Sequence, residues 1–155
     1  MRHFKLIIVT ILSLLTINCR TSSNRVSIEI RHFAGAMGLT IYYLIGDKFV
    51  QVGTNCDFEN CKRKTVYKRE LTRGQSDSLF SILQSLRLDT LKNSYKPKGM
   101  ILDGLVSSIK IAGTGLPNKE IDIDNVDLPT TERLYRAIDK LILTKQYRFY
   151  SFGQE

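Results

Sequence analysis

Residues 26–33 read VSIEIRHF, and this stretch decides the fold because apolar and polar side chains alternate along it. A period of two places successive side chains on opposite faces of an extended chain, so it predicts a β-strand with one buried and one solvated face. Val26, Ile28 and Ile30 are expected to face the core. The rest of the chain must then supply partner strands and a layer that covers this apolar face.

Five further segments have the composition of strands, rich in β-branched and aromatic residues. They are 39–45, 48–54, 64–71, 105–112 and 119–125. Short turns separate most of them, and the turn chemistry of residues 113–118 joins the last two, so hairpins and a mainly antiparallel sheet are expected. In the last strand the two isoleucines should point inward and the three acidic residues outward, at Ile121 and Ile123 and at Glu120, Asp122 and Asp124.

Two helices are predicted from start signals and from apolar stripes at spacings of three and four residues. Thr72 and Gln75 fit a capping box, in which the Thr72 hydroxyl accepts from the Gln75 amide. Pro129 suits the first turn of the second helix. A short helical turn is expected at 90–95, and the aromatic tail 144–155 is expected to pack as a last strand. The two stripes are Leu79, Ile82, Leu83 and Leu86, then Leu134, Ile138, Leu141 and Ile142.

The element order β-β-β-β-α-β-β-α predicts an α+β fold, with a mainly antiparallel sheet and two helices packed on one face. A length of 155 residues favours a single domain. A hydrophobic content of 43% and a charged content of 25% are typical of a globular chain with a proper core. Basic and aromatic side chains on the other face of the sheet are expected to be solvent-accessible.

The N-terminus has the organisation of a signal peptide. Arg2 and Lys5 form a positive start, and residues 6–17 (LIIVTILSLLTI) carry no charge. A permanent helical span needs about 20 apolar residues, so this shorter run predicts an export signal rather than a membrane helix. Residues 1–18 are therefore expected to be removed when the protein is exported to the bacterial cell envelope.

The segment 15–19 (LTINC) resembles the lipobox of bacterial lipoproteins, in which an apolar residue and an invariant cysteine mark the cleavage site. Asn18 stands where a small residue usually precedes the cysteine. The resemblance implies cleavage before Cys19 and attachment to the membrane through acyl chains on this residue. Residues 19–25 are then the lipid anchor and a polar tether, and residues 26–155 form the single α+β domain.

Cys56 and Cys61 are the two cysteines that remain when Cys19 carries lipid. They bracket four residues between two predicted strands, and an exported protein meets an oxidising compartment, so a disulfide that clips a hairpin tip is the favoured interpretation. Closing so short a loop would contribute about 2 kcal/mol. Free thiols are one alternative. A metal site with Asp57 or Glu59 is another, although no histidine is nearby to complete a zinc set.

The formal charge of +8 falls to +6 when Arg2 and Lys5 leave with the signal peptide. In the envelope, the partners expected for a basic chain are lipid headgroups, acidic polysaccharides and other envelope proteins, and no nucleic acid is expected. The basic run after the cysteines has two interpretations, a charged strand edge that resists edge pairing or a patch for an anionic partner. Its residues are Lys62, Arg63, Lys64, Lys68, Arg69 and Arg73.

No catalytic residue is assigned from the sequence. His32 ends the first predicted strand, where a lone histidine is usually structural or solvated, and no paired base is evident for it. Ser107 and Ser108 lie within a strand without an obvious partner. The chain has no nucleophile elbow of the G-x-S-x-G kind.

Carboxylates near the last strand are the remaining candidates for chemistry, as a Ca²⁺ site. Ligands on one strand face stand about 7 Å apart, whereas calcium needs six or more oxygens that converge on one point. A solvated polar face, with Lys110 paired across the hairpin, is the simpler interpretation, and no cofactor is implied. The carboxylates in question are Glu120, Asp122, Asp124 and Asp127.

The element order and the lipobox-like start together resemble small uncharacterised bacterial lipoproteins with a domain of unknown function. The resemblance covers about residues 26–143 and is carried by the cysteine-bearing segment, by Leu71-Thr72 with Gln75, and by Asp103-Gly104. It implies no assigned chemistry. The expected function is a membrane-anchored lipoprotein whose non-catalytic domain binds a protein or envelope component. The alternative is an envelope enzyme or metal-binding protein that uses the carboxylates of residues 120–127.

Overall fold

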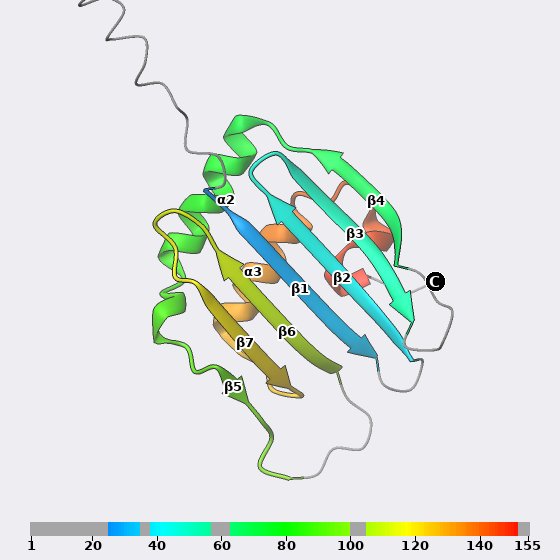
Figure 1. Cartoon of the computed structure of the whole chain (residues 1–155), viewed down its shortest axis with the longest axis vertical. Helices are drawn as coiled ribbons and strands as arrows, with labels where there is room; N and C mark the ends of the chain where they lie inside the picture. The colour runs from blue at the N-terminus through cyan, green and yellow to red at the C-terminus, as the bar shows by residue number, and fades with distance from the viewer. Residues whose placement is uncertain (1–24, 35–37, 57–62, 100–104, 152–155) are drawn as a thin grey trace, which may run out of the picture.

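The computed structural model describes residues 25–34, 38–56, 63–99 and 105–151. Within these ranges one seven-stranded sheet carries two α-helices and three short 3₁₀ turns (Figure 1). The order across the sheet is β4-β3-β2-β1-β6-β7-β5, so β1 lies at its centre. The strands are β1 Ser27–Ala34, β2 Leu39–Gly46, β3 Phe49–Cys56, β4 Lys64–Glu70, β5 Ser94–Tyr95, β6 Leu105–Ala112 and β7 Lys119–Asp124. The helices are α2 Arg73–Ser85 and α3 Pro129–Asp139, and the 3₁₀ turns are η2 Leu88–Thr90, η3 Lys145–Tyr147 and η4 Phe149–Ser151.

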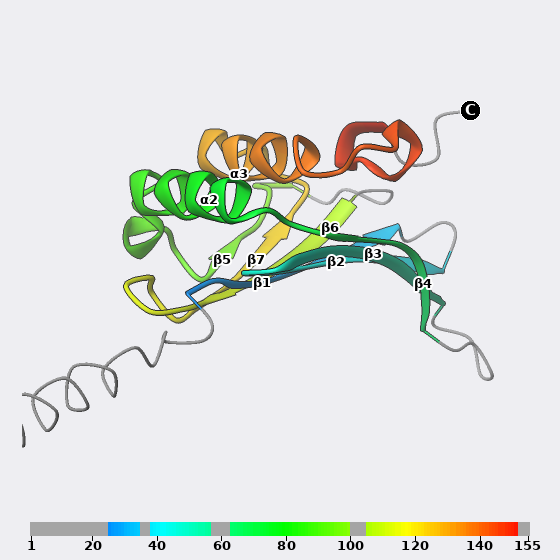
Figure 2. The ribbon, with the colours of Figure 1, turned by 90° about the horizontal axis from the view of Figure 1, so that it is seen from above.

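Both α-helices lie on the same face of the sheet, and the C-terminal turns η3 and η4 continue this layer beside α3 (Figure 2). The core lies between the layers, where Ile30, Ile109, Leu134 and Ile138 are each 0% exposed. The predicted class is therefore confirmed as α+β, with a mainly antiparallel sheet and two helices. The predicted element order is only partly right, because the described chain contains one strand more than expected.

The alternation predicted for the first strand is confirmed by its register. β1 pairs antiparallel with β2 on one side and with β6 on the other. Ile30 stands between Tyr43 and Ile109, and all three side chains are buried. Arg31, one residue further along, is exposed on the opposite face. The row of apolar side chains on β1 is thus the centre of the core, as a period of two requires.

The extra strand is β5, where the sequence favoured a helical turn over residues 90–95. The 3₁₀ turn ends at Thr90, and residues 94 and 95 then pair with β7 in parallel. The backbone amide of Asp122 donates to the Asn93 carbonyl at 2.9 Å, and the amide of Lys92 donates to the Tyr95 hydroxyl at 2.8 Å. A free sheet edge offers such unpaired amides and carbonyls, so a short segment can join it without a strand-like sequence of its own.

The C-terminal tail was expected to form a last strand, and this expectation is wrong over the described residues. It forms η3 and η4 instead, fixed by the Asp139 carboxylate at the end of α3. Asp139 accepts from the backbone amide of Phe149 at 2.6 Å, and Arg148 Nε donates to the Ile142 carbonyl at 2.9 Å. The tail nevertheless packs on the core, because Phe149 and Tyr147 lie against it.

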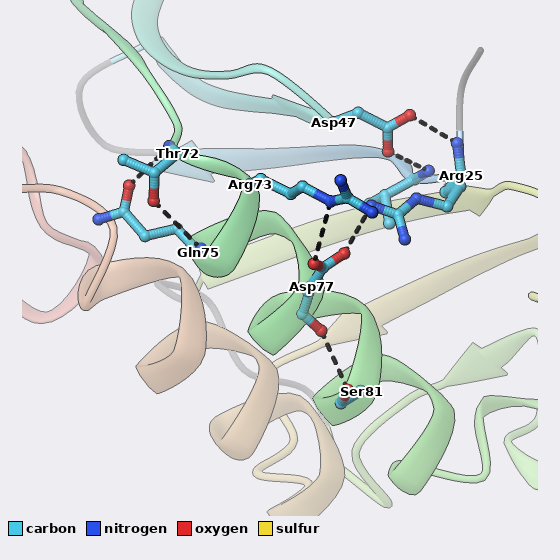
Figure 3. Close-up of polar contacts among 8 residues, drawn as sticks. Arg25, Asp47, Thr72, Arg73, Gln75, Asp77 and Ser81 are labelled. Carbon is cyan, nitrogen blue, oxygen red and sulfur yellow. Dashed lines mark hydrogen bonds and ion pairs between the residues drawn. The ribbon is translucent and has the colours of Figure 1, made fainter. Parts of the chain in front are cut away.

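The predicted capping box at the start of α2 is confirmed (Figure 3). The Thr72 hydroxyl accepts from the Gln75 amide at 3.3 Å, and the Gln75 side chain accepts from the Thr72 amide at 3.0 Å. Pro129 opens α3, as expected from its fixed φ and missing N–H. Both helices therefore begin where the sequence predicts, and this sets the apolar stripes over the sheet.

A second polar cluster fixes the start of the described chain against α2 (Figure 3). The Asp47 carboxylate, in the β2–β3 turn, accepts from the backbone amides of Arg25 at 2.6 Å and Val26 at 2.8 Å. The Arg25 guanidinium in turn lies 2.6 Å from an oxygen of Asp77 on α2. These bonds hold the entry to β1 at one place relative to both layers.

Candidate binding site

His32 and Ser107 face each other across the central strand pair. The register aligns them on β1 and β6, and both point to the helix side, where each is only 4% exposed. Ser107 Oγ lies 2.7 Å from His32 Nδ1, a hydrogen-bond distance. The histidine that looked structural and the serine that lacked a partner are therefore partners, joined across 75 positions of sequence.

Three aromatic rings surround the His32 imidazole. Its centroid lies 6.0 Å from the ring of Tyr43, 5.6 Å from Tyr135 and 3.9 Å from Phe149, each approached edge to face. Burial in this surround lowers the pKa of His32 from 6.5 to about 3, because a charged imidazole would lose its hydration. The ring is thus neutral at physiological pH, and its Nε2 has no hydrogen-bond partner among the described residues.

Tyr135 on α3 extends this polar pair into a chain of three. Burial raises the pKa of Tyr135 to about 12, and its interaction with Ser107 lowers the pKa by less, so the hydroxyl stays protonated. Its ring stacks on Phe149 with centroids 3.8 Å apart and planes 18° apart. Two strands and a helix, β1, β6 and α3, therefore supply these three polar side chains, and Phe149 of the C-terminal turn packs against two of them.

A hollow of about 760 Å³ opens between β7, the start of α3 and the C-terminal turn η4. Buried side chains, namely Ser107, Thr131 and Tyr135, form its floor. The apolar wall consists of Ile123, Val126, Leu128, Pro129 and Phe149. More exposed polar side chains, those of Asn125, Asp127, Glu132 and Tyr150, form the rim. A mostly apolar hollow with a few convergent polar groups is the usual form of a small-ligand site.

The hollow owes its shape to the loop between β7 and α3. Asn125 takes a positive φ of 49°, a backbone conformation that asparagine tolerates better than most residues. Its side-chain amide donates to the Asp124 carboxylate at 2.8 Å. The Thr131 hydroxyl donates to the Leu128 carbonyl at 2.9 Å and fixes the first turn of α3 from inside. These two bonds fix Asn125 and Leu128, two loop residues that line the hollow.

The Ser107–His32 pair has the spacing of a nucleophile and its base, but the acid–base chemistry does not suit that role. A general base works best when its pKa lies near the working pH, and a buried imidazole with a pKa of about 3 is a poor proton acceptor. A catalytic histidine is also oriented by a third group on its second nitrogen. His32 Nε2 has no such group among the described residues. The arrangement is better suited to presenting hydroxyl groups to a bound molecule.

The carboxylates proposed for a metal site are spread over different surroundings. Glu120 pairs with Lys110 at 3.0 Å across the β6–β7 hairpin, as the simpler interpretation predicted. Asp122 is exposed on the face of the sheet that carries no helix, and Asp127 lies at the rim of the hollow. In the part of the chain that the structure describes, no three histidine, cysteine or acidic side chains gather closely enough to hold a metal ion.

The basic run does not gather on one surface over its described residues. Arg69 points to the helix side and donates to the Leu141 carbonyl at 3.1 Å, and Arg73 lies on α2, 3.8 Å from Asp77. Lys64 and Lys68 are exposed on β4, which is the edge strand that one interpretation required.

Arg63 instead lies on the open face of the sheet. Its guanidinium stacks 3.6 Å above the ring of Tyr42, with Glu29 at 4.0 Å. Tyr42 is therefore only 3% exposed, although aromatic residues of this face were expected to be accessible.

The processing sites fall largely outside the described residues. This holds for the predicted signal peptide 1–18, for the predicted lipid-anchor residue Cys19 and for Cys61. Lys62 of the basic run also lies outside the described residues. Cys56 ends β3. Because Cys61 lies outside the described residues, a disulfide between the two stays a prediction. Among the described residues, no helix is both long enough and apolar enough to cross a bilayer.

A signal for the buried trio is present in the sequence, although sequence reasoning missed it. His32 continues the inward row of Ile28 and Ile30, and Ser107 continues the inward row that Ile109 begins. A polar residue in an inward row must find a buried partner. The sequence does not reveal that β1 and β6 are neighbouring strands. Because they are, His32 and Ser107 become hydrogen-bond partners.

Comparisons of the chain with protein-family models, with curated proteins and with solved structures found no match.

Proposed function

We propose that this chain is a lipid-anchored protein of the bacterial cell envelope, whose α+β domain binds a protein or envelope component in the hollow beside α3. The charged start, the uncharged run 6–17 and the lipobox-like segment ending at Cys19 support the location. The bonds of Asp47 to the amides of Arg25 and Val26 support a tether that ends at the first residues of a rigid domain.

The observation that carries the binding function is the floor of the hollow. Ser107 and Tyr135, two buried residues with hydroxyl groups, line it between apolar walls, and the neutral imidazole of His32 lies behind Ser107. Polar groups in such a place lower the stability of the fold unless they are satisfied, and one nitrogen of His32 is not satisfied by any described residue. A site that binds a ligand gives the Ser107 and Tyr135 hydroxyls, which belong to residues lining the hollow, a use that core packing alone does not.

An enzymatic function is the second candidate, because Ser107 and His32 stand at 2.7 Å. The depressed pKa of His32 counts against it, since the imidazole would have to accept a proton while enclosed by three aromatic rings. If it were correct, purified protein would show turnover in a broad hydrolase screen and Ser107→Ala would abolish that turnover. Binding without turnover agrees with the proposal.

The location is tested by fatty-acid labelling. Replacing Cys19 by alanine should abolish incorporation of a radiolabelled fatty acid and release the protein from membranes. A cytosolic protein that starts at Met1 would contradict the location.

The binding surface is tested by capture from envelope extracts with a matched pair of tryptophan variants. Val126→Trp fills the hollow, whereas Val106→Trp adds the same bulk on the open face of the sheet, where Val106 is 39% exposed. We expect Val126→Trp to lose the captured component and Val106→Trp to keep it. Equal capture by both variants would place binding elsewhere.

A further inference from the structure

The mouth of the hollow carries an unbalanced negative charge in a protein that is basic overall. Two carboxylates, those of Asp127 and Glu132, stand at the rim. Glu132 is already paired with Arg136 one helical turn later, at 2.7 Å. Asp127 is exposed and has no ion-pair partner among the described residues. One full negative charge is therefore left over at the entrance.

The start of α3 opposes this charge, and the two effects can be compared. The first-turn amides of α3 have no side-chain cap and carry about half a positive charge. Glu132 lies in that first turn but is already paired with Arg136, so its charge is not counted again here. Asp127 lies two positions before Pro129 and contributes a whole charge. The balance at the entrance is therefore negative, and it favours a cationic group over an anionic one.

Aromatic faces at the same place are suited to a cation with an apolar arm. The Tyr135 ring in the floor stacks on the Phe149 ring in the wall, and the Tyr150 ring at the rim has its centroid 5.9 Å from that of Phe149. The protein itself places one cation here, since the Arg136 guanidinium lies 5.3 Å from the centroid of the Tyr150 ring. Cation–π attraction of this kind adds to the pull of a carboxylate.

From this geometry we propose that the hollow takes a primary ammonium ion on an apolar arm. The arm packs against Ile123, Leu128 and Phe149, and the ammonium group lies at the rim beside Asp127. The hydroxyls of Ser107 and Tyr135 form the polar end of the floor. This inference rests on the proposed binding function and gives its ligand a chemical class.

The test uses three probes that share one apolar arm and differ in the head group. Phenethylammonium, phenethyl alcohol and hydrocinnamate are titrated into the lipidated protein, isolated from membranes in detergent micelles, and backbone amide shifts of residues 123–132 are followed by NMR. We expect the ammonium probe to bind about fivefold more tightly than the alcohol, with the carboxylate weakest. Each probe partitions into detergent equally for every variant, so differences between variants report on the site.

Two carboxylate variants make the test specific. Asp127→Asn should remove most of the advantage of the ammonium probe and leave the affinity of the alcohol unchanged. Asp122→Asn, on the opposite face of the sheet, is the matched control and should change neither. If hydrocinnamate bound more tightly than phenethylammonium, the inference would be overturned, because the first-turn amides of α3 would then set the charge preference. Equal affinities unaffected by Asp127→Asn, or no shifts in residues 123–132 with any probe, would also overturn it. None of these outcomes affects fatty-acid labelling at Cys19, so the envelope location is judged separately.

Discussion

Acidification should destabilise this protein through one residue, His32. The imidazole is buried and uncharged in the fold with a pKa of about 3, whereas in the unfolded chain it titrates near 6.5. Because the folded value is the lower one, the unfolded state binds more protons below pH 6.5. The contribution of His32 to stability is therefore complete above that pH and is lost as the pH falls from 6.5 towards 3.

The size of the effect follows from the gap between the two pKa values. At pH 5 the imidazole is protonated in the unfolded chain but not in the folded one. The pH is then about 1.5 units below the unfolded-state pKa, and each unit lowers the free energy of unfolding by 1.36 kcal/mol. The expected loss is about 2 kcal/mol between pH 8 and pH 5. This figure depends little on the exact folded value, provided that the folded pKa stays below about 4.

Urea unfolding at the two pH values, followed by circular dichroism, measures this loss. His32→Asn removes the titration and keeps an amide that can donate or accept a hydrogen bond at Ser107, so the variant should be less stable at pH 8 but lose about 2 kcal/mol less on acidification. Burial raises the pKa of Asp139, which acts in the opposite direction, but that contribution is common to both proteins and cancels. The only other histidine is His3, in the predicted signal peptide. An imidazole NMR signal of His32 that titrates near pH 6.5 in the folded protein would refute the reasoning.

Four further substitutions test the packing and the hydrogen bonds at the starts of α2 and of β1, each by the free energy of unfolding in urea. Gly53→Ala should cost about 1–3 kcal/mol because the added methyl group overlaps the Tyr42 ring and the Lys64 carbonyl, whereas Gly74→Ala meets nothing within 4 Å in α2 and should stabilise by up to about 1 kcal/mol. If the two alanines have equal effects, the packing of Tyr42 across Gly53 is wrong. Thr72→Ala should cost about 1 kcal/mol through loss of the capping box, and a neutral result would show that the box adds nothing. Asp47→Ala leaves two backbone amides without their acceptor and should cost about 1–3 kcal/mol, with faster trypsin cleavage near the N-terminal entry; unchanged cleavage would argue against the clamp.

Local patterns predicted the helices and strands of this fold well, because the spacing of apolar residues and the start signals of each element lie within its own sequence. The strand at 26–33 alternates, and the helix after Thr72 begins with a reciprocal pair of hydrogen bonds. Neither pattern says which strands are neighbours. The order of the sheet comes from the long-range pairing of β1 with β6, and that pairing brings His32 to Ser107. β5 was missed because two residues carry no period and are held mainly by the edge they join.

The basic residues between Lys62 and Arg73 are close in sequence, but the described ones lie on different faces of the domain. Alternation along β4 sends neighbouring residues to opposite faces, so Arg69 turns inward beside Val50 while Lys68 faces outward beside Gln51. A count of positive charges along the sequence therefore overstates the charge of any one surface. The strand period of two, applied to residues 64–70, would already have divided the run between the two faces.

The hollow could not be predicted from one segment, because the β7–α3 loop, the first turns of α3 and the C-terminal turn each supply part of it. The sequence nevertheless shows that polar residues near its floor, such as His32, lower the stability of the fold, because they interrupt rows of buried apolar side chains. An isoleucine at position 32 would continue the row of Ile28 and Ile30 without an unsatisfied nitrogen, whereas a histidine there costs about 1–3 kcal/mol for the buried group. Apart from the hydrogen bond to Ser107, folding alone gives no reason for histidine at this position. A reason exists if the Ser107 and Tyr135 hydroxyls that it supports are used in binding at the open end of the hollow.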